Sequence, residues 1–248
     1  MGSPASATCG SWPTRRSPSR RARPCGATIP DGTLRWPLEL RGRTPGGEDL
    51  LLRPLARRDR IEFSRLRARN LAWLQEWEAT SPVEGSSTVT FNDYVRNQHA
   101  EAREGRLLPL VITTAEDGAI VGQLNTSNIV VGAARTCTMG YWVSRSVAGR
   151  GIMPTAVAIV ADHLMRAEGL HRVEINIRPE NAASLAVVRK LGFRDEGLRP
   201  HFLHIDGAWR DHRSFAVTTE DLAGRSLMQR LNQQSQQSLQ RHTEERPL

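Results

Sequence analysis

Two glycines on either side of an arginine, Gly149, Arg150 and Gly151, lie where an apolar stretch ends and a helical pattern begins. The first N–H groups of a helix have no partner within the helix, and the helix dipole places partial positive charge at the same point. Glycine lets a ligand approach the main chain closely, and the Arg150 side chain adds a charge. We therefore expect an anion here, and a phosphate or pyrophosphate is the natural ligand. The alternative is a plain strand-to-helix turn.

Two common nucleotide-binding motifs do not fit this stretch. A triphosphate-binding loop requires G-x-x-x-x-G-K-[ST], and no Gly-Lys pair occurs here. The dinucleotide motif G-x-G-x-x-G begins correctly at Gly149 and Gly151, but Pro154 stands in place of its third glycine. The preceding strands also resemble a hairpin meander and not the first strand of a βαβ unit. The phosphate ligand expected at this turn is therefore not one that either of these two motifs binds.

The window AGRGIM, residues 148–153, resembles the [QR]-x-x-G-x-[GA] signature of the GNAT family of acyl-CoA-dependent N-acetyltransferases. Gly151 matches the central glycine, whereas Ala148 and Met153 depart from the first and last positions. Main-chain N–H groups supply most phosphate contacts in such a loop, so these departures leave the expected cradle intact.

Three other stretches carry the same resemblance. Residues 172–197 are similar to the family's later strand and helix, with N-x-x-[SA] at residues 181–184 and K-L-G-F at residues 190–193. FLHIDGAWRDH, residues 202–212, and LAWLQEWEAT, residues 71–80, resemble elements of the ribosomal-protein alanine N-acetyltransferases, the RimJ/RimL group. Together these similarities cover residues 48–220.

The resemblance implies acetyl-CoA as the acyl donor. Main-chain groups of the GYWVS strand would bind the pantetheine arm and the oxyanion, with Val143 nearest the acetyl end, and the N–H groups of residues 147–153 would bind the diphosphate. The implied cofactor-binding residues are Tyr141, Trp142, Val143, Val147, Ala148, Gly149, Arg150, Gly151, Ile152, Met153, Asn181 and Ser184.

A second implied role is protonation of the leaving thiolate. Many members use a tyrosine seven residues after the asparagine of N-x-x-[SA], and that position is Val188 here. Ser184 is the implied substitute, directly or through an ordered water, with a small residue at a helix N-terminus as the alternative. Asn181 also fits a helix N-cap, which is compatible with a cofactor contact.

The proton acceptor has several candidates. Glu174 shares a strand face with Asn176 and could act through water if that face lines the cleft. Glu76 and Glu78 compete, because the Trp-Glu element would lie on the peptide side of the cleft. Each of the three can instead be an ordinary surface carboxylate. His201, His204 and His212 lack the spacing of metal ligands, and we expect no metal.

The elements that must position these groups follow from hydrophobic periodicity. The helix over 57–74 has Ile61, Leu66 and Leu74 among its apolar positions. The order is β-α-α-β-β-β-α-β-α-β-β, which predicts an α/β (α+β) fold with a GNAT-like mixed, mostly antiparallel central sheet flanked by helices. Strands are expected at 49–55, 108–114, 119–131, 136–144, 171–177, 197–206 and 208–218, and helices at 57–74, 91–105, 151–168 and 181–191.

The two ends differ in composition from the middle. Residues 1–47 are rich in Pro, Gly, Ser and Arg without periodicity, so we expect a disordered or non-native basic extension before a domain at residues 48–220. Eight arginines against two acidic residues give residues 1–45 a net charge of +6 of the chain's +8. Nucleic-acid contact is therefore expected only through this arm. Residues 221–248 read as a polar tail with a short helix.

The cysteines and the apolar runs indicate the compartment. Cys9, Cys25 and Cys137 are odd in number and have no close spacing, which favours a reducing cytoplasm. No apolar run has the length of a membrane helix, and we expect no membrane partner. We expect a cytoplasmic enzyme that acetylates a protein N-terminal α-amine, such as that of a ribosomal protein. The alternatives are a small-amine or antibiotic N-acetyltransferase and a non-catalytic acyl-CoA-binding or ribosome-associated module.

Overall fold

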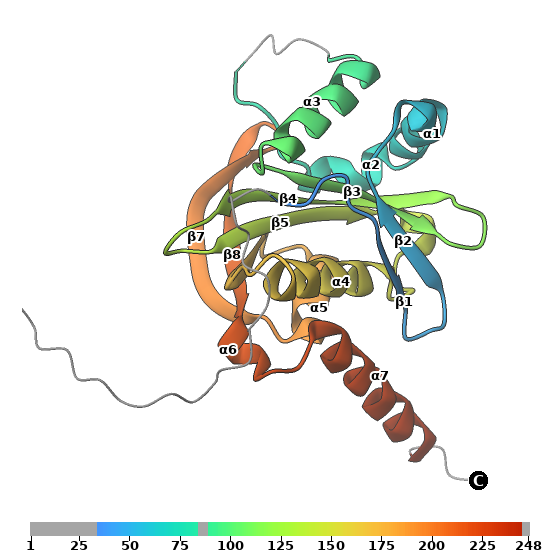
Figure 1. Ribbon diagram of the computed structural model, residues 1–248, viewed down its shortest axis with the longest axis vertical. Helices are drawn as coiled ribbons and strands as arrows, with labels where there is room; N and C mark the ends of the chain where they lie inside the picture. The colour runs from blue at the N-terminus through green and yellow to red at the C-terminus, as the bar shows by residue number, and fades with distance from the viewer. Residues whose placement is uncertain (1–33, 84–88, 245–248) are drawn as a thin grey trace, which may run out of the picture.

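An eight-stranded sheet forms the centre of the computed structural model, which describes residues 34–83 and 89–244 (Figure 1). The strand order is β1-β2-β3-β4-β5-β6-β8-β7, and every neighbouring pair is antiparallel except β5 and β6. The strands are β1 Leu40–Arg43, β2 Asp49–Arg53, β3 Leu108–Thr114, β4 Ile120–Val130, β5 Thr136–Val143, β6 Arg172–Ile177, β7 Arg194–Ile205 and β8 Ala208–Thr218.

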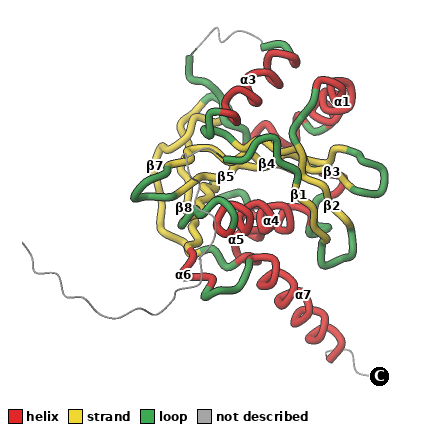
Figure 2. Tube along the Cα trace, in the orientation of Figure 1, coloured by secondary structure: helices red, strands yellow, loops and turns green. Residues whose placement is uncertain are grey.

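Helices cover both faces of this sheet, as Figure 2 shows. Helices α1 and α3 contribute to a small apolar cluster on one face, whereas α4, α5 and α7 pack into the larger core on the other. The helices are α1 Arg60–Arg69, α2 Leu71–Leu74, α3 Phe91–Arg103, α4 Ile152–Arg166, α5 Ala182–Leu191, α6 Thr219–Leu222 and α7 Leu227–Glu244, and the 3-10 turns are η1 Arg57–Asp59, η2 Gln75–Trp77 and η3 Arg145–Val147.

The predicted order of elements is confirmed from β2 to β8. Within that order, the parallel pair β5 and β6 is unusual. Its pairing covers only residues 136–138 against 172–174, after which the two strands diverge. Beyond Thr138, β5 therefore has main-chain groups that β6 does not satisfy, and this opening in the sheet positions the candidate site.

The sheet and core include residues that precede the predicted domain boundary at residue 48. Leu34 lies in the core, and β1 pairs with β2 in antiparallel register. Gly42 packs so closely on α4 that an added Cβ would lie 2.3 Å from Ile159 Cδ1. β1 is a short edge strand with half-exposed residues, so its sequence carries little periodic signal. Residues 1–33 of the predicted extension lie outside the described residues.

The predicted helix over 57–74 is broken at Asn70 into α1 and α2. The Asn70 amide donates to Leu66 O at 2.9 Å and binds the loop after β5, which competes with continuation of the helix. Leu66 and Leu74 are buried as expected, but Ile61 is 59% exposed.

The C-terminal segment is more ordered than the predicted polar tail with a short helix. Helix α7 extends over 18 residues, and Leu227 and Leu231 are buried in the core. The Asp162 carboxylate of α4 accepts the N–H groups of Leu227 at 2.8 Å and Met228 at 3.0 Å. Leu227 and Leu231, four residues apart, lie on one face of this glutamine-rich helix and pack into the core. None of the described helices has the length and apolar character that a bilayer crossing requires.

Candidate active site

Two cavities meet at the opening between β5 and β6. Cavity 1, of about 430 Å³, lies among α2 and η2, β5, the loop before α4 and one side of α5. Cavity 2, of about 330 Å³, lies among β5, β6, the end of α2 and the β7–β8 hairpin. The residues that line both cavities are Leu74, Trp77, Tyr141, Trp142, Asn181 and Ser184. One ligand in each cavity would thus meet at Tyr141 and Ser184.

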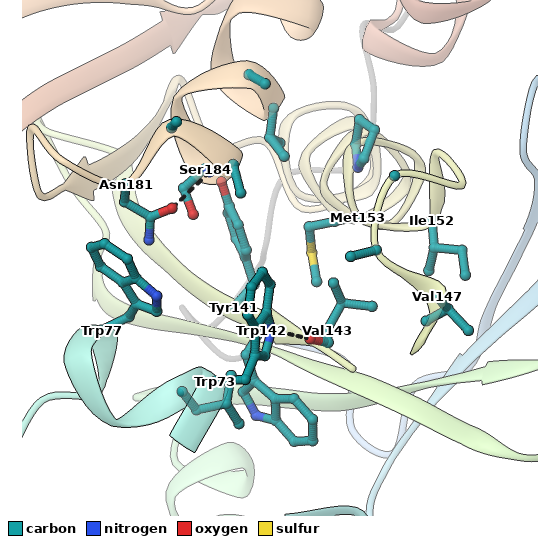
Figure 3. A pocket seen from close by; sticks show the side chains of 18 of the residues that line it. Trp73, Trp77, Tyr141, Trp142, Val143, Val147, Ile152, Met153, Asn181 and Ser184 are labelled. Atoms are coloured by element: carbon teal, nitrogen blue, oxygen red, sulfur yellow. Dashed lines mark hydrogen bonds between the residues drawn. The ribbon is translucent and has the colours of Figure 1, made fainter. Parts of the chain in front are cut away.

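Strand β5 offers main-chain groups to this opening. Ser144 N donates to Val121 O at 2.8 Å, so these two residues form a hydrogen-bonded pair of the β4–β5 ladder. Since such pairs alternate along antiparallel strands, Val143 and Tyr141 direct their N–H and C=O groups away from β4. The Val143 carbonyl accepts from Trp73 Nε1 at 3.2 Å (Figure 3). The N–H of Val143 and the main chain of Tyr141 face the gap beside β6.

The N-terminus of α4 supplies donors to cavity 1. Gly151 is its N-cap with φ of +81°, Gly149 has φ of +85°, and none of the side chains that the structure describes caps the helix. The N–H groups of Val147, Ala148 and Arg150 donate within the preceding turn at 3.1 to 3.4 Å. Within the described part of the chain, the N–H groups left without a partner are therefore those of Gly149, Gly151, Ile152 and Met153, a narrower set than the predicted residues 147–153.

Every predicted cofactor-binding residue except Arg150 lines cavity 1. The Arg150 side chain instead pairs with Glu48, with Nη2 at 3.0 Å from Oε1. Lys190, the single lysine of the chain, lines cavity 1 and brings a positive charge that the sequence motif did not indicate.

Ser184 and Tyr141 bring two hydroxyl groups to the junction of the cavities (Figure 3). Asn181 Oδ1 accepts from Ser184 N at 2.9 Å, so Asn181 is the predicted N-cap of α5 and fixes the serine's position. The Tyr141 hydroxyl is buried and makes no hydrogen bond of regular geometry with the described residues. Burial raises the pKa of Tyr141 well above its usual value, and the neighbouring Ser184 hydroxyl opposes that rise. Val188 is fully buried, away from both cavities.

The predicted carboxylates lie less favourably for proton transfer. Glu174 lies outside both cavities and accepts from Arg172 Nε at 2.7 Å. Glu78 lines cavity 2, but Arg67 Nη2 holds both its oxygens at 2.6 Å. Glu76 lines cavity 1. The geometry therefore favours neither Glu174 nor Glu78, whose catalytic role stays a prediction.

Cavity 2 also contains polar side chains to which sequence analysis gave no catalytic role. Asn125 Oδ1 is buried without a partner in the described part of the chain. Asn176 Oδ1 accepts from Ser214 Oγ at 2.7 Å, and its amide N–H groups remain for a ligand. His212, 3% exposed, lines the same cavity from β8. Alternation along β8 puts His212 and Ser214 on one face, but only the register with β6 reveals that this face lines the cavity.

Arginines stacked on tryptophans hold the wall that the two cavities share. Arg178 lies 5.3 Å from the Trp77 ring centroid and donates to Glu76 O at 2.7 Å. Arg67 lies over Trp142 at 5.2 Å. The contacts of Arg178 join η2 to the end of β6, and that of Arg67 joins α1 to β5. Across the described residues, no group of three or more His, Cys, Asp or Glu side chains is arranged to hold a metal ion.

The sequence matches a family described as "Acetyltransferase (GNAT) domain" over residues 49–194. A probable N-acetyltransferase of Bacillus subtilis is 36% identical over 110 residues, which cover 44% of this chain and 61% of that relative. The alanine N-acetyltransferase of ribosomal protein uS5 from Escherichia coli is 28% identical over 172 residues, which cover 69% of this chain and 89% of the relative.

A solved structure shares both sequence and fold with this chain. RimJ of Mycobacterium smegmatis, in complex with CoA-disulfide, is 40% identical, with a TM-score of 0.72 and coverage of 79% of this chain and 94% of that protein. The predicted mixed, mostly antiparallel fold and the predicted enzyme class, an acetyl-CoA-dependent acyltransferase, are thereby confirmed. With its eight-stranded sheet open between β5 and β6 and a glycine-rich loop before α4, the chain belongs to the GNAT family of acetyltransferases.

Proposed function

We propose that this protein transfers the acetyl group of acetyl-CoA to the α-amine of a protein N-terminus, and that the acceptor is a ribosomal protein. The observation that carries this proposal is the meeting of two cavities at Tyr141 and Ser184. Cavity 1 would take the acyl donor and cavity 2 the acceptor, so the two substrates would react directly in one complex. Similarity to the alanine N-acetyltransferase of ribosomal protein uS5 favours an N-terminal alanine.

The residues of cavity 1 fit the donor. Four free N–H groups at the start of α4 suit a diphosphate, and the helix dipole adds to their attraction for it. Lys190 adds a positive charge, and Val147, Ile152 and Met153 give the cavity an apolar wall suited to a pantetheine arm. Acetyl-CoA, when bound, supplies the reactive thioester.

The reaction would use groups at the junction of the two cavities. The N–H groups of Val143 and Tyr141 point away from β4 into the gap beside β6, where they would stabilise the negative charge that develops on the acetyl oxygen. Ser184 would donate a proton to the leaving sulfur, and the Tyr141 hydroxyl beside it would keep the Ser184 hydroxyl oriented. Ser184 is assigned this role because it occupies the last position of the family's N-x-x-[SA] motif.

Cavity 2 suits an extended chain with a charged end. The segment after η2 runs beside the β7–β8 hairpin, with Thr80 N donating to His204 O at 2.9 Å, and forms one wall. The Asn125 oxygen can accept from an ammonium group inside the cavity. Leu203 and Trp209 of the hairpin are exposed, and Leu203 lines the cavity.

The test is a transfer assay with purified protein and acetyl-CoA. Peptides that begin with Ala, Ser, Thr or Met are compared with the same peptides blocked at the N-terminus and with small amines, and both CoA release and peptide mass are followed. We expect one acetyl group on the α-amine of the open peptides and none on the blocked ones. Acetylation of small amines alone would establish the small-amine alternative, and CoA binding without turnover would establish a binding module.

A further inference from the structure

His212 occupies a buried position on the acceptor side of the site. It lies on β8 opposite Arg199 of β7, two residues from Ser214, which bonds Asn176 of β6. Its imidazole packs edge-on against the Phe202 ring, with centroids 5.6 Å apart, and lines cavity 2. Ser184 lines the same cavity, so the histidine and the predicted proton donor share one cavity.

The hydrogen bonding of His212 determines which nitrogen carries the proton. Nδ1 lies 3.0 Å from Arg210 O, and a carbonyl oxygen can only accept, so Nδ1–H donates this bond. In the neutral imidazole, Nε2 then holds the free lone pair. Among the described residues Nε2 has no hydrogen-bond partner, and it is not one of the fully buried polar atoms that lack one. Nε2 therefore has accessible surface, and the side chain that carries it lines cavity 2.

The other titratable side chains of cavity 2 are poor proton acceptors. The guanidinium groups of Arg67 and Arg178 are hydrogen-bond donors and have no acceptor atom. Both oxygens of Glu78 are held by Arg67 at 2.6 Å. Tyr141 is a protonated phenol, because its burial raises its pKa. Among the described titratable side chains of this cavity, His212 is therefore the one with a free lone pair near neutral pH.

We propose that His212 is the proton acceptor of the transfer reaction, and that its Nε2 removes one proton from the α-ammonium of the acceptor in cavity 2. The inference rests on the proposed function. One N–H bond breaks, its electron pair becomes the nitrogen lone pair, and His212 becomes an imidazolium. The amine then forms the C–N bond as the C–S bond breaks. The second nitrogen proton passes to sulfur through Ser184, and His212 releases its proton to water, so one ammonium and one thioester give one amide, one thiol and one proton.

The surroundings of His212 keep it neutral at pH 7. Burial lowers the pKa of His212, the Arg210 carbonyl raises it as a hydrogen-bond acceptor, and Arg178 adds a lowering effect. Glu180 and Asp211 raise it. Arg199 of β7 lies opposite His212, and the paired Arg67 and Glu78 line the same cavity. The neutral form therefore persists below the usual histidine value of 6.5.

The test compares His212→Asn with the wild-type protein. Asparagine retains a donor for Arg210 O but has no lone pair with the basicity of imidazole. We expect kcat/KM at pH 7 to fall by roughly 10² to 10⁴, the usual worth of general base catalysis. We also expect the rate of the variant to rise about tenfold per pH unit up to the pKa of the free α-amine, about 8. The wild type should instead keep its activity at neutral pH and lose it only at a pH below 6.5, where His212 becomes protonated. Added imidazole should restore part of the variant's activity.

His201→Asn is the matched control, because His201 lies on the same hairpin with its side chain 80% exposed. The affinity for CoA and the midpoint of thermal unfolding should stay near wild type in both variants. Unchanged kcat/KM in His212→Asn, or a loss with the wild-type pH profile, would overturn the inference and leave the proposed function standing. If the wild type acetylates only small amines, the proposed function is wrong, and the same comparison with a small amine as acceptor tests the role of His212 separately. Absence of turnover on every amine would reject both the proposed function and the role of His212.

Discussion

Asn70 Oδ1 accepts a hydrogen bond from the main-chain N–H of Arg145 at 2.9 Å, which ties the break between α1 and α2 to the loop that leads to α4. The Asn70 amide also bonds Ser144 Oγ at 3.1 Å. We predict that Asn70→Ala lowers the free energy of unfolding by about 2 kcal/mol, because it leaves buried polar groups without partners. The Kd for CoA should rise as well. Chemical denaturation and calorimetric titration measure both, with the exposed Asn97→Ala as the control.

The two glycines before α4 allow a sharp test of the cofactor loop. Gly151→Glu places a carboxylate and a strained backbone at the free N–H groups, where a diphosphate would bind. We predict that CoA binding weakens by roughly a hundredfold, about 2.7 kcal/mol. Gly118→Glu is the matched control, since Gly118 has φ of +70° in an open turn. Titration calorimetry that finds equal affinities in the two variants would place the phosphate site elsewhere.

Substitution of Ser184 should slow the acetyl transfer step and leave the binding of acetyl-CoA unchanged. We predict that Ser184→Ala lowers kcat by roughly 10² with little change in the KM for acetyl-CoA, since the main-chain bond to Asn181 remains. Tyr141→Phe should lower kcat less, and the double variant should lose little more than Ser184→Ala if the two hydroxyls act as a unit. Steady-state kinetics with the exposed Ser64→Ala as control decides this. Full activity in Ser184→Ala would assign proton donation to water.

The buried ion pair before α1 predicts a dependence of stability on pH. Asp59 accepts from Arg53 at 2.7 and 3.0 Å and from Ala56 N at 2.8 Å. Burial alone would raise the Asp59 pKa, but these bonds outweigh it and lower the pKa below 3.8. Because the folded pKa is depressed, the stabilisation is complete above about 3.8 and is lost as the pH falls through the lower folded value.

Asp59→Asn should therefore cost about 3 kcal/mol at pH 7, because Arg53 is left without its charge partner. The difference from wild type should shrink as the pH falls below 3.8. Denaturation with urea at several pH values measures it, and the exposed Glu116→Gln should show no such trend. A constant difference at every pH would mean that packing, and not charge, accounts for the loss.

The cofactor loop could be predicted from sequence because its chemistry lies in contiguous residues. Gly149 and Gly151 both adopt positive φ, which glycine favours, and they lie between a strand and a helix that periodicity identifies. The asparagine of N-x-x-[SA] likewise bonds a residue three positions later. Such short-range geometry leaves a pattern in the sequence.

The acceptor side could not be predicted in this way. Asn176 and His212 reach the same cavity through the register of β6 with β8, and no local pattern records which residues lie opposite each other in two separate strands. The pairing of Glu78 with Arg67, 11 residues apart, likewise depends on the break at Asn70. Candidate carboxylates chosen by strand face alone therefore included Glu174, which the fold pairs with Arg172.

Helix α4 has consequences for the order of synthesis and folding. Its apolar surface is covered on one side by β1, through Gly42 and Ile159, and on another by Leu227 and Leu231 of α7. Segments almost two hundred residues apart must both reach this helix before it is enclosed, and contacts between residues so far apart in sequence form slowly. As long as Leu231 of a nascent chain is still inside the ribosome, the apolar face of α4 is exposed to other hydrophobic surfaces. We expect chaperone dependence to fall once α7 has emerged from the ribosome.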